Sequence, residues 1–194
     1  MIEEMLTYAS INKVPIIDKE SLSFITKLIK EKNIKSILEL GSAIGYSAIN
    51  FARINENITI TTIERDTIRY NEAVKNVNKF KLENRINLIN DDIFNVNIID
   101  TYDLIFIDAA KSQNEKFLNK FKNNLNEKGI IIIDNLSFHG LVGKSSEIKG
   151  KNLRSLVKKI ENFLEYLNNQ NEFKVEIVKV GDTLCVLEKI QKNI

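Results

Sequence analysis

The stretch Ser36-Ile-Leu-Glu-Leu-Gly-Ser-Ala-Ile-Gly-Tyr-Ser47 decides the fold of this chain. Its first part, 36–40, is a short apolar run that predicts a buried strand. Gly41 and Gly45 follow, and two glycines four apart let the backbone turn sharply and approach a ligand closely. The residues 46–54 then predict a helix. Because many α/β proteins contain such a strand, turn and helix, the turn alone is weak evidence of a binding loop.

The rest of the chain repeats this alternation of strand and helix. Further strands are expected at 58–63, 86–89, 102–107, 129–133, 173–180 and 183–188, and further helices at 67–81, 114–124 and 152–167. Repeated βα units predict a parallel, doubly wound α/β sheet. Gly181-Asp182 predicts a terminal hairpin, which makes one late strand antiparallel. The whole chain, 1–194, is expected to form one domain, with 1–30 as an N-terminal cap segment.

Composition places the chain among ordinary globular proteins. It has 194 residues, of which 43% are hydrophobic and 28% charged, as is usual for a single domain. No apolar run reaches the roughly 18 residues of a membrane span, and the N-terminus lacks a signal pattern. We therefore expect a cytoplasmic protein without a membrane partner. The single Cys185 and the single His139 exclude an internal disulfide and a His/Cys zinc site.

Acidic residues after the second and third strands indicate a nucleoside ligand. Glu64 ends the second strand, where a carboxylate can accept both hydroxyls of a ribose. The Gly-x-Gly-x-x-Gly fingerprint of pyrophosphate binding is absent, which disfavours a dehydrogenase. Glu39 adds negative charge that suits the cationic groups of S-adenosylmethionine (SAM). Asp92 follows the third strand and either approaches the adenine or, with Asp91, caps the next turn.

Two carboxylates and an amide follow the fourth and fifth strands. Asp108, Asp134 and Asn135 should meet at the carboxyl edge of the sheet, and such oxygens suit Mg²⁺ or Ca²⁺. The alternative is that the two aspartates are helix or turn caps. Lys111 lies one turn past Asp108 and could take a substrate proton, or could be a solvated side chain.

A basic stretch follows these acidic residues. Between Lys144 and Lys159 there are six Lys or Arg residues and one Glu. Such a face is usually solvated, but it could also meet an anionic substrate. Its start is expected at the mouth of the site.

Three ordered motifs resemble the metal-dependent O-methyltransferases, the group that contains catechol and caffeoyl-CoA O-methyltransferases. They are 38–47, Phe106-Ile-Asp-Ala-Ala-Lys111 and Ile133-Asp-Asn135. The resemblance implies a Rossmann-like class I methyltransferase with a mostly parallel seven-stranded sheet. Further short segments resemble the bacterial tRNA methyltransferases that act on 5-hydroxyuridine at the wobble position: Val14-Pro-Ile16, Ala109-Ala-Lys-Ser-Gln113, Phe138-His-Gly-Leu-Val142 and Leu156-Val-Lys-Lys-Ile160.

The resemblance also implies a role for each site residue. SAM would be bound by Ile17, Glu39, Gly41, Ser47, Glu64, Asp92, Ile93 and Asp108. A divalent cation, Mg²⁺ or another, would be held by Asp108, Asp134 and Asn135. Lys111 and Asp108 would be catalytic. Asp91 stands where the family has a glycine.

These observations leave three hypotheses for function. The first is methylation of 5-hydroxyuridine in the tRNA anticodon loop, giving 5-methoxyuridine. The second is O-methylation of a small catechol-like acceptor, and the third is nucleotide binding without catalysis. A homodimer is compatible with all three.

Overall fold

A computed structural model describes residues 1–191 of the chain. Its strands form one seven-stranded sheet in the order β3-β2-β1-β4-β5-β7-β6. They are β1 (Ser36–Leu40), β2 (Thr59–Ile63), β3 (Ile86–Ile89), β4 (Tyr102–Ile107), β5 (Leu125–Ile133), β6 (Phe173–Val178) and β7 (Leu184–Lys189). β7 runs antiparallel to both β5 and β6, whereas β3, β2, β1, β4 and β5 pair in parallel. The predicted parallel sheet with a C-terminal antiparallel hairpin is confirmed.

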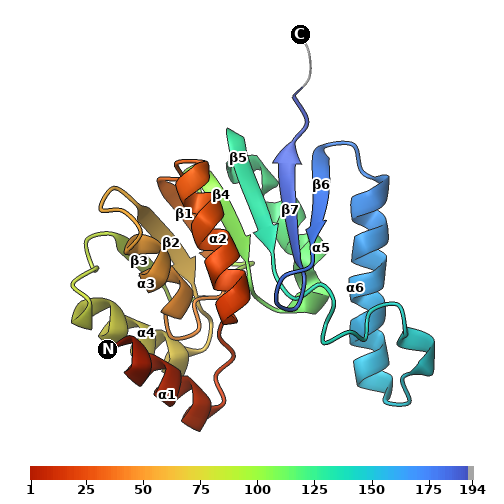
Figure 1. The fold of residues 1–194 in the computed structure, drawn as a ribbon, viewed down its shortest axis with the longest axis horizontal. Helices are drawn as coiled ribbons and strands as arrows, with labels where there is room; N and C mark the ends of the chain where they lie inside the picture. Colours follow the sequence, from red (N-terminus) through yellow and green to blue (C-terminus); the bar gives the residue numbers. More distant parts are fainter. Residues whose placement is uncertain (192–194) are drawn as a thin grey trace.

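Helices cover both faces of the sheet (Figure 1). The core on one face includes residues of α1 (Ile2–Asn12), α2 (Lys19–Glu31), α3 (Tyr46–Ala52) and α4 (Thr67–Lys79). The other face packs against α5 (Asn114–Phe121) and α6 (Lys151–Asn169). Three short 3₁₀ segments are η1 (Lys111–Gln113), η2 (Lys122–Asn124) and η3 (Ser145–Glu147). Within residues 1–191, none of the helices has the length and apolarity that a membrane span needs.

The central strands are apolar on both sides because both faces of the sheet are covered. Ile37 of β1 belongs to the core beside α3, whereas Leu38 and Leu40 belong to the core beside α5 and α6. This is the two-residue alternation of a strand. It also places Glu39 on the same face as Ile37, a position that matters for the site.

The N-terminal segment, expected as a cap, folds into two helices that were not predicted. Asp18 begins α2, and its Oδ1 accepts hydrogen bonds from the backbone N–H groups of Glu20 and Ser21, each at 2.9 Å. Ile25 and Ile29, one turn apart, are fully buried against the sheet. This capping residue and apolar spacing are a helix signal that was present in the sequence.

Strand β5 begins four residues earlier than expected. Its first residue, Leu125, pairs with Tyr102, and the register shifts before Leu104 pairs with Ile130. The residues between these pairs are largely exposed. The beginning of the strand was therefore not predicted, because it is not part of an apolar run.

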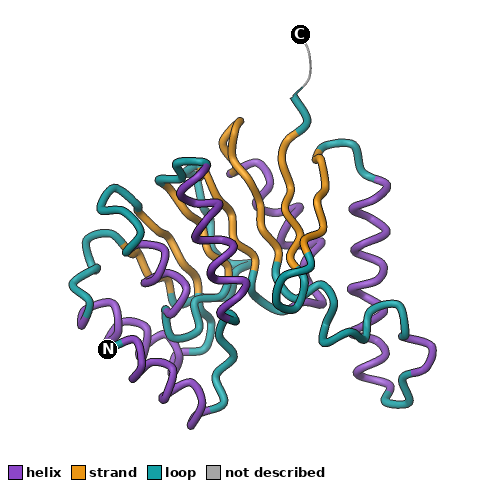
Figure 2. Tube along the Cα trace, viewed as in Figure 1, coloured by secondary structure: helices purple, strands orange, loops and turns teal. Residues whose placement is uncertain are grey.

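Four parallel strands end in register at one edge of the sheet. Leu40 pairs with Ile63 and with Ile107, and Ile107 pairs with Ile133. The loops that follow these strands lie along the lower edge of the sheet in Figure 2. The residues that directly follow the four strand ends are therefore brought to one place.

Candidate active site

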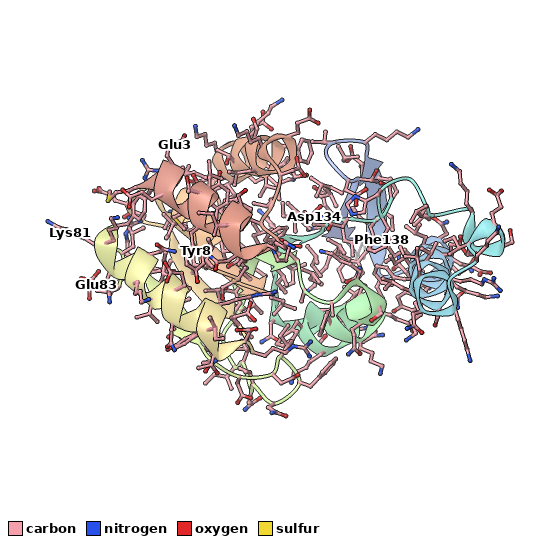
Figure 3. All side chains as sticks on the ribbon, turned by 90° about the horizontal axis from the view of Figure 1, so that it is seen from below. Glu3, Tyr8, Lys81, Glu83, Asp134 and Phe138 are labelled. Carbon is pink, nitrogen blue, oxygen red and sulfur yellow. The ribbon has the colours of Figure 1, made fainter. Side chains whose placement is uncertain are left out.

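A pocket of about 330 Å³ opens at this edge. Its wall includes ten of the predicted site residues: Ile17, Gly41, Ser47, Glu64, Asp92, Ile93, Asp108, Lys111, Asp134 and Asn135. Figure 3 looks onto the edge from below, with Asp134 near its centre and the α1 and α4 ribbons to one side. Ten of the eleven predicted site residues therefore lie together in one pocket, although they make up fewer than half of the residues that line it.

The glycine loop passes directly beside the fourth strand. Gly41 has φ +104°, and a Cβ there would lie 2.7 Å from the backbone oxygen of Asp108. The N–H groups of Gly41 and Ser42 both donate to the carbonyl of Ile63, at 3.0 and 3.2 Å. A side chain at position 41 would therefore push the cofactor loop away from Asp108.

Glu64 holds the glycine loop in place while facing the pocket. Its Oε2 accepts the N–H of Ala43 at 2.9 Å, and its Oε1 accepts the N–H of Asp66 at 2.8 Å. The residue is 9% exposed. Each carboxylate oxygen can accept a second hydrogen bond, so the geometry leaves capacity for ribose hydroxyls.

Glu39 is the predicted cofactor residue that does not line the pocket. Its side chain points from the face of β1 toward α3 and is fully buried. Its carboxylate accepts hydrogen bonds from Thr62 Oγ1 at 2.5 Å and from Ser47 Oγ. Glu39 therefore lies behind Ser47, and its expected direct contact with SAM stays a prediction.

Burial raises the pKa of Glu39 to about 7. The nearby charges of Asp108 and Glu64 raise it further, and the two hydroxyl hydrogen bonds oppose the shift. Burial makes this carboxylate costly to ionise, although two hydroxyls donate to it.

Asp92 is both a turn cap and a residue of the pocket wall, and its approach to the adenine stays a prediction. Its Oδ1 accepts the N–H of Phe94 at 2.9 Å, as a turn cap does, and the residue also lines the pocket. Arg65 lies nearby, with Nη1 3.7 Å from Asp92 Oδ2.

Several wall residues were missed by the sequence reasoning. They are Pro15, Ile16, Ser42, Ala43, Tyr46, Ile63, Arg65, Arg69, Phe94, Ala109, Ala110, Gln113 and Phe117. Ser42 and Tyr46 belong to the glycine loop and could have been found by extending it. Phe94 stacks on Phe117 with ring centroids 5.2 Å apart, a contact between distant segments that only the fold reveals.

The acidic part of the pocket combines an ion pair with an unpaired carboxylate oxygen. Lys111 Nζ lies 2.5 Å from Asp108 Oδ1. Asp134 is 1% exposed, and burial raises its pKa to about 6, with a further contribution from the charge of Asp108. Its Oδ1 accepts the N–H of Asn135 at 2.6 Å. Its Oδ2 is buried and has no hydrogen-bond partner within residues 1–191.

This donor set fits a divalent cation. A buried carboxylate oxygen without a partner is costly unless a cation or a donor meets it. Asp108, Asp134 and Asn135 supply the oxygen donors that Mg²⁺ prefers. The described part of the chain contains no group of three or more His, Cys, Asp or Glu side chains suited to a metal, so a cation held here would need the amide of Asn135 as its third donor.

The basic stretch is not where it was expected. No residue of 144–159 lines the pocket. In Figure 1 its first part follows the loop after β5 along the lower edge, and α6 stands beside β6 at the far end of the sheet from β3. After Asn135 the chain is held against the turn between β6 and β7, because the N–H groups of Leu136, Ser137 and His139 donate to Thr183 and Asp182 of that turn.

A doubly wound sheet with a glycine loop, an acidic residue after β2 and an acidic pocket at the carboxyl edge defines a Rossmann-like methyltransferase. Comparison with known proteins identifies the family. The family model described as O-methyltransferase matches residues 3–190. The chain belongs to this O-methyltransferase family.

Individual relatives agree with this assignment. The chain is 30% identical over 190 residues to Tapetum-specific methyltransferase 1 of Arabidopsis thaliana, covering 92% of this chain and 80% of that protein. It is 28% identical over 173 residues to caffeoyl-CoA O-methyltransferase of Populus kitakamiensis, covering 84% and 74%. A solved structure of a candidate caffeoyl-CoA O-methyltransferase from Staphylococcus aureus is 37% identical, with a TM-score of 0.90 over 97% of this chain and 91% of that one.

Proposed function

We propose that this protein is a SAM- and divalent-metal-dependent O-methyltransferase whose acceptor carries two neighbouring oxygens, as a catechol does. One observation carries the proposal. The unpartnered Oδ2 of buried Asp134 lines the same pocket as Asn135 and the Asp108–Lys111 ion pair. The family indicates O-methylation as the reaction, and these side chains form the place where we propose that it occurs.

The other part of the pocket supports SAM as the methyl donor. Glu64 can accept the ribose hydroxyls, and Asp92 with Ile93 lies where the adenine would be placed across the glycine loop. Ser47 faces the pocket while donating to Glu39, so Glu39 fixes the orientation of the Ser47 hydroxyl. We therefore assign Glu39 to positioning rather than to direct binding.

Asp108, Asp134 and Asn135 would hold the divalent cation. When bound there, it would supply positive charge that lowers the pKa of the acceptor hydroxyl and a second attachment point for a neighbouring oxygen. In the transfer, the bond between sulfur and the methyl carbon breaks as the bond between that carbon and the acceptor oxygen forms. S-adenosylhomocysteine leaves, and the hydroxyl proton is lost.

Lys111 is the chain's own group for handling that proton or its charge. Its Nζ contacts Asp108 and lines the pocket. A neutral Lys111 would accept the proton, whereas a charged Lys111 would stabilise the developing oxygen anion. The Asp108 carboxylate holds the Lys111 side chain toward the acceptor in either case.

The comparisons favour a small acceptor. Relatives that match most of the chain carry the name caffeoyl-CoA O-methyltransferase, and the basic stretch 144–159 is absent from the pocket wall. A second candidate is 5-hydroxyuridine in a tRNA anticodon loop, whose 5-hydroxyl and O4 are also neighbouring oxygens. The observation that favours tRNA is the positive charge of the basic stretch 144–159, which begins at the same edge of the sheet and could bind phosphates.

A side-by-side acceptor assay tests the proposal. The enzyme is incubated with labelled SAM and Mg²⁺ and with one of three acceptors: caffeoyl-CoA, its monohydroxylated analogue, or tRNA that contains 5-hydroxyuridine. We expect methylation of caffeoyl-CoA well above that of the monohydroxylated analogue. Product from tRNA alone would favour the second candidate, and equal methylation of the two small acceptors would contradict the need for neighbouring oxygens.

A further inference from the structure

Residues 135–140 adopt an unusual backbone just beyond the acidic pocket. Asn135, Phe138 and His139 have positive φ values of 65°, 44° and 57°, and Gly140 follows with 75°. The left-handed region is costly for residues with a Cβ and persists where surrounding contacts enforce it. The position of Asn135, a proposed metal ligand, therefore depends on whatever holds this loop.

The contacts that hold the start of this loop come from the turn between β6 and β7. The N–H of Leu136 donates to the carbonyl of Thr183 at 3.0 Å, and the N–H of Ser137 donates to the carbonyl of Asp182 at 3.1 Å. Asp182 Oδ1 also accepts the N–H of His139 at 2.7 Å and the hydroxyl of Ser137. One carboxylate thus accepts two hydrogen bonds from the segment that follows Asn135.

Asp182 is well placed to act as a fixed support. Its side chain is 16% exposed, and its second oxygen, Oδ2, lies 3.6 Å from Nδ1 of His139. In the sequence, Phe138 lies between the two donors Ser137 and His139, and Figure 3 labels it beside Asp134. The side chain reaches this loop from a residue 47 positions after Asn135.

The same turn also packs against the N-terminal wall of the pocket. A Cβ at Gly181 would lie 2.3 Å from Asp18 Oδ2 and from Ser21 Oγ. Asp18 caps α2 and directly follows the pocket residues Ile16 and Ile17. The turn therefore lies between two segments that both border the pocket and contacts each of them.

We propose that Asp182 is a positioning residue for the acidic pocket: it sets the backbone after Asn135 and thereby the placement of the Asn135 amide. This inference rests on the proposed function, in which Asn135 is a metal ligand. Asp182 itself does not line the pocket. It acts through the loop, as partners in the outer shell of metal sites do.

The experiment compares Asp182→Ala with a matched control, Asp103→Ala. Asp103 is also a partly buried carboxylate that accepts backbone N–H groups, those of Lys35 and Ser36, but at the start of β4, far from the pocket. Three quantities are measured on the full chain: Mn²⁺ affinity by calorimetry, SAM affinity by calorimetry, and amide hydrogen exchange of peptides that cover 136–143.

We expect Asp182→Ala to weaken Mn²⁺ binding roughly tenfold or more, to change SAM affinity by less than about threefold, and to speed exchange in 136–143. Asp182→Asn should restore most of the loss, because its amide oxygen can still accept from His139 and Ser137. Ser137→Ala, a milder change, should have a smaller effect in the same direction. Asp103→Ala should lower stability without altering Mn²⁺ affinity.

Two results would overturn the proposal. One is wild-type Mn²⁺ affinity in Asp182→Ala, and the other is unchanged exchange in 136–143. A wild-type protein that binds no Mn²⁺ would instead contradict the proposed function, and the exchange measurement would then decide alone whether Asp182 holds the loop.

Discussion

The ammonium group of Lys111 lies 2.5 Å from Oδ1 of Asp108, and the two side chains are only 14% and 20% exposed. The pair lies at the end of β4, where the sheet delivers Asp108 to the pocket and η1 turns Lys111 back toward it. One side chain of the pair is a proposed metal ligand, and the other faces the place of the acceptor. In the proposed mechanism, this contact would link metal binding to proton handling.

The first prediction concerns Lys111. Lys111→Met should lower kcat by roughly 10²-fold, the usual contribution of a general base, with little change in SAM affinity. Steady-state kinetics and calorimetry measure the two effects. Lys116→Met, an exposed lysine on α5, is the control and should behave as wild type. An unchanged kcat and pH–rate profile in Lys111→Met would show that the base is elsewhere.

The second prediction concerns Glu64. Glu64→Gln should weaken SAM binding by about 1.5–3 kcal/mol, the range for hydrogen bonds to a charged group. Because Glu64 also accepts the N–H groups of Ala43 and Asp66, thermal unfolding must show that the variant is folded. Glu72→Gln, on α4 but outside the pocket wall, is the control. Wild-type SAM affinity in a folded Glu64→Gln variant would remove Glu64 from the cofactor site.

The third prediction is a dependence of stability on pH that comes from Glu39. Its pKa is about 7 in the folded protein against an ordinary value of 4.5. Between these values the folded state binds more protons than the unfolded state, so the free energy of unfolding falls as pH rises. The loss is on the order of 3 kcal/mol, complete above about pH 7.

Glu39→Gln should remove this part of the pH dependence, because an amide can share hydrogen bonds with Ser47 and Thr62 without ionising. Urea unfolding of both proteins at pH 4.5 and pH 8, without SAM, measures it. The difference between wild type and variant isolates Glu39, since the other carboxylates are common to both. Parallel pH profiles would contradict the raised pKa.

Much of the fold could be predicted because the strands are apolar runs separated by recognisable turns. The glycine loop, the residues after each strand end and the hairpin signal at Gly181-Asp182 sufficed for the sheet and for ten of the residues that line the pocket. Helix α2 was missed because the cap at Asp18 was not recognised as a helix start, and α1, whose N-cap is Met1, has no side-chain cap. The start of β5 was missed because its first residues are largely exposed.

The different orientations of two glutamates at the site could not be predicted from the sequence. Glu39 and Glu64 look alike in sequence, each an acidic residue at the end of a strand. Glu39 is still inside β1 and points from the sheet face toward α3, whereas Glu64 follows the end of β2 and faces the pocket. Likewise, the support of Asp182 for the loop after Asn135 joins segments that only the fold brings together. The tRNA partner, the homodimer and the cytoplasmic location stay predictions.

The dependence of methyl transfer on a divalent cation tests the central claim most directly. The enzyme is freed of metal with EDTA, dialysed, and assayed with labelled SAM and caffeoyl-CoA as Mg²⁺ is added back. A cation that activates the acceptor contributes several kcal/mol. We therefore expect activity to fall by roughly 10²-fold or more without it. Mg²⁺ should restore wild type but not Asp134→Asn, in which the buried carboxylate is lost. Full activity after EDTA, or an Asp134→Asn variant as active as wild type, would contradict the account.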